Sequence, residues 1–146
     1  AGGIGITPLH SCFRTLYVLA RAGLLPVTRI HLIWVTRNPL YFEMYRSTFD
    51  TVAADSLHTR FKFSFYCTEE EDDYVRPPPP LGPRNLQLPP LPYSTGRPDL
   101  KKEIVGLAAY GMHALVYANG PKSLQDECRE NAAKGGVDYR SESFAI

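Results

Sequence analysis

The chain opens with a glycine-rich segment whose spacing suits an anion. The sequence "AGGIGITPLH" places glycines at positions 2, 3 and 5, and without a Cβ their backbone N–H groups are open to a ligand. Thr7 and Pro8 follow as the predicted N-cap and first residue of a helix, whose positive end attracts negative charge. The pattern predicts a phosphate-binding turn. Its simpler alternative is a glycine turn that only connects a strand to a helix.

A cation follows the next predicted strand. The strand Arg29–Thr36 ends in "WVTRNP", which places Arg37 at its carboxyl end. Sites for NAD usually carry an acid there for the ribose 2′-hydroxyl, whereas a 2′-phosphate needs a cation, and the planar guanidinium pairs well with phosphate. Arg37 therefore favours NADPH, although Pro8 replaces the third glycine of the usual GxGxxG fingerprint. A solvated arginine at a strand end is the alternative.

The elements that must position these residues alternate between helix and strand. Alternation places Phe61, Phe63 and Phe65 on one face of a strand. The spacing of apolar residues predicts helices over 7–22, 40–57, 98–110 and 121–135, and strands over 29–36, 60–68, 113–120 and 137–146. This order predicts an α/β fold with a doubly wound, mostly parallel sheet. In such a sheet the strand before the glycine turn is central, so we expect the first strand to lie upstream, in a longer protein.

The composition changes between residues 69 and 95. The acidic run "EEEDD" is followed by a proline-rich stretch, which predicts a flexible insert within a single domain that spans residues 1–146. The acidic run is typical of a solvated loop. "PPLP" at Pro89–Pro92 resembles a WW-domain ligand and "PLGPR" at Pro80–Arg84 nearly matches an SH3 ligand. A docking partner of this type and a plain insertion both remain open.

Composition and charge exclude several classes of function. The chain has 146 residues and a net charge of +1, so no overall field favours nucleic acid as a partner. The three cysteines and four histidines are scattered without metal-ligand spacing, so we expect reduced thiols and no metal site. No run approaches the roughly 18 apolar residues of a membrane span. No Ser/His/Asp or Cys/His arrangement stands out, which suits chemistry carried by a cofactor.

Five motifs in order resemble the NADP-binding lobe of the ferredoxin reductase superfamily. They are "GGIGITP", "WVTRNP", "GRPDL", the Gly120–Pro121 turn after a late strand, and a terminal "SESF". The match is best with the membrane branch of that superfamily, the ferric reductases and NADPH oxidases, and it covers nearly the whole chain apart from the insert. The resemblance implies a Rossmann-like NADP-binding lobe.

The resemblance also implies roles for individual residues. Arg37 would hold the 2′-phosphate, with Arg97 as a second contact on the adenosine side. Asn119 stands where the family usually has cysteine; its amide can hydrogen-bond the nicotinamide carboxamide. Phe144 matches the aromatic residue that stacks on the flavin until nicotinamide displaces it. Gly3, Gly5, Thr7 and Pro8 would cradle the pyrophosphate and approach the nicotinamide ribose, and Ile6 among them would also contact the cofactor. Gly120 and Pro121 match the late turn beside the nicotinamide.

The function that the resemblance implies is electron transfer across a membrane. The chain would be the NADPH-binding part of a flavohaem transmembrane oxidoreductase, on the cytosolic face of a membrane. FAD would be bound mainly by a preceding barrel and haem by a membrane domain of the same polypeptide. Hydride would pass from NADPH to FAD and electrons onward through haem. "GRPDL" and "VDYRSESF" favour ferric chelates as acceptor.

Two alternative functions remain. One is an NADPH oxidase that produces superoxide or hydrogen peroxide. The other is a non-catalytic nucleotide-binding scaffold that recruits partners through its proline-rich segment.

Overall fold

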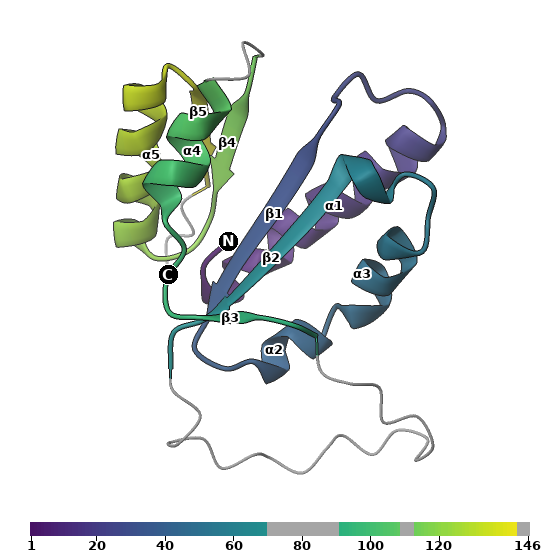
Figure 1. Ribbon diagram of the computed structural model, residues 1–146, viewed down its shortest axis with the longest axis horizontal. Coiled ribbons are helices and arrows are strands. Elements are labelled where there is room, and N and C mark those ends of the chain that lie inside the picture. Colours follow the sequence, from purple (N-terminus) through teal and green to yellow (C-terminus); the bar gives the residue numbers. More distant parts are fainter. Residues whose placement is uncertain (70–90, 109–112, 143–146) are drawn as a thin grey trace.

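The computed structural model describes residues 1–69, 91–108 and 113–142, and it confirms the predicted alternation of helices and parallel strands (Figure 1). In chain order the elements are η1 (Gly3–Gly5), α1 (Ile6–Arg21), β1 (Ile30–Thr36), α2 (Leu40–Glu43), α3 (Arg46–Ala53), η2 (His58–Arg60), β2 (Phe61–Cys67), β3 (Ser94–Thr95), α4 (Leu100–Ala108), β4 (Leu115–Ala118), α5 (Lys122–Gly135) and β5 (Asp138–Ser141).

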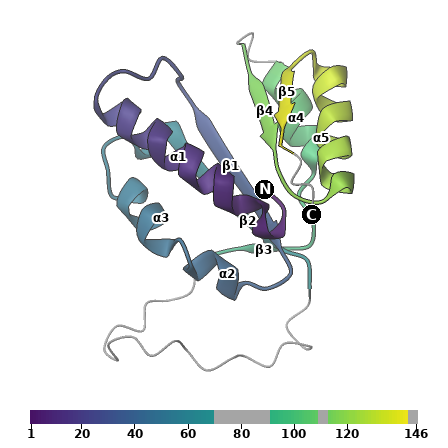
Figure 2. The same cartoon turned by 180° about the vertical axis from the view of Figure 1, so that it is seen from behind.

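The strands form two parallel sheets. The first has the order β1-β2-β3 and the second pairs β4 with β5. Helix α1 covers one face of the first sheet, whereas α4 and α5 lie on the opposite side of the molecule against the second sheet, as the two opposed views agree (Figures 1 and 2). The carboxyl ends of the parallel strands therefore point to one edge, where ligands bind in open α/β sheets.

Ala1 and Gly2 lie between the two sheets. The Ala1 amino group donates to the Ile33 carbonyl and the Val35 N–H donates to the Ala1 carbonyl, which continues the parallel ladder on the free side of β1. On the other side Gly2 N–H donates to the Asn119 carbonyl directly after β4, at 2.8 Å. The residues before the glycine turn thus take the central position that the doubly wound pattern predicts.

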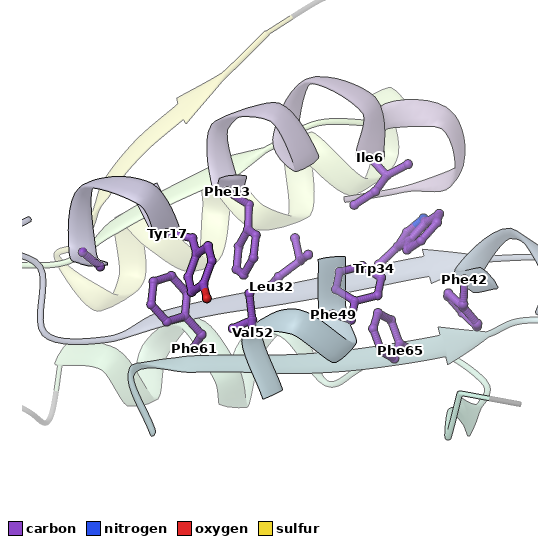
Figure 3. Packing of buried hydrophobic residues seen from close by; sticks show 11 residues of the cluster. Ile6, Phe13, Tyr17, Leu32, Trp34, Phe42, Phe49, Val52, Phe61 and Phe65 are labelled. Carbon is purple, nitrogen blue, oxygen red and sulfur yellow. The ribbon is translucent and has the colours of Figure 1, made fainter. Parts of the chain in front are cut away.

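The main core lies between the first sheet and helices α1 to α3 (Figure 3). Phe61 and Phe65 of β2 are buried on one face, as the alternation predicts, and Phe63 packs against the same cluster. Phe13 of α1 meets Phe61 edge-on with ring centroids 5.4 Å apart, a favourable aromatic geometry. A second, smaller core joins α4, α5 and β4 through Leu100, Ile104, Ala118, Cys128 and Ala132.

Two predicted helix boundaries are wrong. Helix α1 begins at Ile6 with Gly5 as N-cap, and no side chain caps it; Thr7 is already inside the helix and exposed. The predicted helix over 40–57 is two short helices, α2 and α3, because the chain leaves helical geometry at Tyr45 (φ −117°, ψ 14°). This break lets α2 and α3 present Phe42 and Phe49 separately to the core.

The predicted insert, residues 69–95, lies largely outside the described residues. Where it is described after the gap, Ser94–Thr95 forms β3 against β2, and Leu91 and Tyr93 pack on the main core. These last residues therefore belong to the sheet layer. The docking motif of Pro80–Arg84, the first half of that of Pro89–Pro92, and Phe144 fall outside the described residues.

His31 connects the first sheet with α4. Its Nδ1 lies 3.5 Å from a Glu103 carboxylate oxygen of α4, and its Nε2 lies 2.9 Å from the Ser64 hydroxyl of β2. Burial, followed by the positive charge of Lys62, lowers the pKa of His31 to about 4, although Glu103 acts in the opposite direction. At neutral pH the imidazole is uncharged, so its contact with Glu103 is not an ion pair.

Acid should destabilise the fold through His31. Its folded-state pKa is below the ordinary 6.5, so the unfolded chain binds more protons between about pH 4 and 6.5 and the free energy of unfolding falls as pH drops through that window. At 1.36 kcal/mol per pKa unit the loss is up to about 3 kcal/mol. In urea denaturation at pH 7 and pH 4.5, the His31→Gln variant should lose less stability than the wild type. The exposed His58→Gln is the control; equal losses in wild type and His31→Gln would contradict this account.

Candidate nucleotide-binding site

The glycine turn is hydrogen-bonded to a buried side chain of the first sheet. Trp34 of β1 is 1% exposed and its indole Nε1–H donates to the Gly3 carbonyl at 3.1 Å, while the Gly5 N–H donates to the Gly2 carbonyl at 3.0 Å. Gly3 has φ +53° and open space where a Cβ would stand. The turn therefore offers a ligand the open backbone at Gly3, whereas the amide of Gly5 is already engaged.

A second glycine turn packs against the first, backbone to backbone. Gly120 has φ +138°, and a Cβ there would lie 2.9 Å from the Gly2 backbone. A Cβ on Gly5 would lie 2.7 Å from the carbonyl of Asn119. Side chains at either position would force the two turns apart. Gly5 and Gly120 are thus required for the close approach of the two turns, one directly before α1 and the other directly after β4.

Asn119 lies at the junction of the two turns. It is 1% exposed, and its carbonyl accepts from the Gly2 N–H. Its side-chain Nδ2 atom is buried without a hydrogen-bond partner within the described part of the chain. A buried donor without a partner costs about 1–3 kcal/mol, so a ligand oxygen at this donor would recover part of that free energy.

Helix α5 connects the second turn with Glu142, the residue directly after β5. Gln125 donates from Nε2 to the Gly120 carbonyl at 2.8 Å and lies 3.5 Å from the Glu142 carbonyl. The Tyr139 hydroxyl of β5 donates to the Gln125 carbonyl. Burial raises the pKa of Tyr117 to about 12, and its hydrogen bond to Glu142 acts in the same direction. These contacts bring Glu142, directly after β5, beside the Gly120 turn.

Arg37 projects from the carboxyl end of β1. The turn behind it is closed by Asn38, whose backbone N–H donates to the Thr36 hydroxyl and whose side chain accepts from the Leu40 N–H. The Arg37 side chain is 82% exposed, and its Nε lies 3.6 Å from a Glu69 carboxylate oxygen. A guanidinium so exposed is accessible to a phosphate at this edge of the sheet.

Arg97 follows β3 at the same edge of the first sheet. Gly96, with φ +85°, turns the chain there, and its N–H donates to the Cys67 carbonyl at the end of β2. Arg97 is exposed. Because β2 lies between β1 and β3, Arg97 and Arg37 flank the end of β2 from its two sides.

The predicted residues form two groups at one edge of the sheets. Gly2 and Gly5 of the first turn lie close to Asn119–Pro121, and a Cβ on Gly2 would lie 2.8 Å from Pro121. Ile6, Thr7 and Pro8 follow as the first residues of α1. Arg37 and Arg97 make up the other group only in the sense that they follow β1 and β3, the two strands that flank β2. Three contacts of the site were not predicted from the sequence. They are the hydrogen bond from Trp34 to Gly3, the hydrogen bond from Gln125 to Gly120, and the acid Glu69 beside Arg37. Only Glu69 had a usable signal, its place directly after the predicted strand 60–68.

The fold and the paired glycine turns define a nucleotide-binding α/β domain. Within the described residues no cluster of His, Cys, Asp or Glu could hold a metal ion. In the same part of the chain no helix is long and apolar enough to cross a bilayer.

A comparison with protein-family models matches residues 1–78, just over half of the chain, to the ferric reductase NAD-binding domain. The chain belongs to this family. It is a pyridine-nucleotide-binding module of oxidoreductase type. No curated protein matches the chain.

Adding one methyl group at Gly5 should test how closely the two turns are packed. Gly5 has an ordinary helical conformation (φ −59°), so Gly5→Ala tests only the clash with Asn119, and we expect a loss of about 1–3 kcal/mol of stability from overpacking. Gly106 in α4 has open space at its Cβ position, so Gly106→Ala should be neutral or more stable by up to about 1 kcal/mol. Urea denaturation of both variants measures this. Similar stability changes in the two would contradict the packing argument.

Proposed function

We propose that the chain binds NADPH and presents it to a flavin in a flavohaem transmembrane oxidoreductase. One observation carries the choice of NADPH: Arg37, at the carboxyl end of β1, is 82% exposed and stands where an NAD site would have an acid. Membership of the ferric reductase NAD-binding family supports the wider assignment.

The residues fit a dinucleotide with two anionic regions. The open backbone at Gly3 and the amino end of α1 suit the pyrophosphate, and Arg37 suits the 2′-phosphate, with Arg97 beyond it. The unpaired Asn119 amide suits the carboxamide oxygen. When bound, NADPH supplies a hydride for a flavin. The protein's own work is to orient the nucleotide and to exclude water.

The acceptors beyond the nucleotide are part of the same proposal. The FAD is held mainly by a barrel domain, haem carries single electrons through a membrane, and ferric chelates receive them on the other side, while this domain stays on the cytosolic face. The motifs "GRPDL" and "VDYRSESF" support ferric chelates over oxygen. Phe144 is proposed to cover the flavin until nicotinamide displaces it.

Removing the charge of Arg37 should reduce the affinity for NADPH alone. Hydrogen bonds to charged groups contribute about 1.5–3 kcal/mol, so we expect Arg37→Gln to raise the KM and Kd for NADPH by roughly ten- to hundredfold. The values for NADH should stay within about twofold, because NADH has no 2′-phosphate. The measurement is steady-state flavin reduction and nucleotide titration on the full-length flavoprotein.

Arg129→Gln provides the matched control. Arg129 is another exposed arginine beside an acid, Asp126, but it lies on α5, and its replacement should leave both nucleotides unaffected. Equal losses of NADPH and NADH affinity in Arg37→Gln would refute the assignment of Arg37. A wild-type protein that binds neither nucleotide at millimolar concentration would refute the proposed function itself.

A further inference from the structure

Glu69 is an acid beside the cation that the proposed 2′-phosphate site needs. Its carboxylate oxygen lies 3.6 Å from the Arg37 Nε, and its side chain is 53% exposed. Arg37 follows β1 directly and Glu69 follows β2 by two residues, and β1 and β2 are neighbours in register, with Thr36 opposite Cys67. The pair is therefore placed by the sheet and not only by two long side chains.

The backbone holds the two residues together. The Thr68 N–H donates to the Thr36 carbonyl at 2.9 Å, which extends the ladder one step past the strand ends. The thiol of Cys67, 2% exposed, lies 3.2 Å from the Arg37 carbonyl and 3.6 Å from the Glu69 carbonyl. A thiol has one proton, so it serves one of the two carbonyls at a time. Both segments are thus anchored at the end of β2.

The negative charge of Glu69 opposes the binding of a phosphate at Arg37. An exposed ion pair contributes little to stability, so Arg37 can exchange Glu69 for another anion. A 2′-phosphate bound to Arg37 would lie close to the Glu69 carboxylate, and like charges at that distance repel one another. A nucleotide without the phosphate meets no such repulsion.

We propose that Glu69 is a specificity-determining residue that lowers the affinity of this site for a 2′-phosphorylated nucleotide. This inference rests on the proposed function. In the free protein Glu69 occupies the Arg37 guanidinium. A 2′-phosphate that binds Arg37 must displace the Glu69 carboxylate and is still repelled by its negative charge. Glu69 thereby reduces the preference for NADPH over NADH that Arg37 alone would give.

Neutralising Glu69 tests the proposal in the full-length flavoprotein. We expect Glu69→Gln to lower the Kd for NADPH and for 2′,5′-ADP about three- to fivefold at low salt, in the range of a surface charge pair. The Kd for NADH and 5′-AMP should not change. The gain should shrink as the salt concentration rises, since screening weakens exposed charges. A purely structural role would alter both nucleotides and would not depend on salt.

Asp126→Asn is the matched control, because Asp126 pairs with Arg129 at 2.7 Å on the surface of α5. This variant should leave the Kd of all four ligands unchanged. An unchanged Kd for 2′,5′-ADP in Glu69→Gln, a weaker one, or an equal gain for 5′-AMP would overturn the role of Glu69. The proposed function fails separately, if the wild-type protein binds neither NADPH nor NADH, and the assignment of Arg37 fails separately, if Arg37→Gln binds NADPH normally.

Discussion

The close packing of two backbone turns organises the ligand edge of this domain. Gly5 and Gly120 lack the side chains that would separate the turns, and Gly2 N–H joins them through the Asn119 carbonyl. This contact requires glycine for steric reasons, independently of any ligand. Because it is made, the amino end of α1 and the turn after β4 reach the same edge of the molecule, where a dinucleotide could touch both.

Two groups of residues divide the recognition of the proposed nucleotide. The turns provide backbone and one buried amide, which suit parts common to NADH and NADPH. Arg37 and its neighbour Glu69 are exposed side chains that differ in their effect on the 2′-phosphate. Under the proposed function, coenzyme preference can therefore change without disturbing the packed turns, because it would depend on two surface charges.

The alternation of helices and strands was predictable because it depends on local apolar periodicity, as in Phe61 and Phe65. The position of Arg37 was predictable for the same reason, since it follows a strand. The N-cap was not, because Gly5 packs against the backbone of Asn119, which is distant in sequence. The pairing of Arg37 with Glu69 was also hidden, since it depends on the register of β1 with β2.

Ala1 and Gly2 provide the backbone bonds from β1 on one side and to the end of β4 on the other. A rotation of one sheet against the other would change the separation between Arg37 and the Gly120 turn. A ligand that contacts both Arg37 and the Gly120 turn would bind less tightly after such a rotation. The bound ligand would therefore oppose the rotation by the same free energy. The alignment of the two sheets and the occupancy of the proposed site would thus be coupled. A change that favours one alignment would change the affinity for the ligand, and binding of the ligand would favour that alignment.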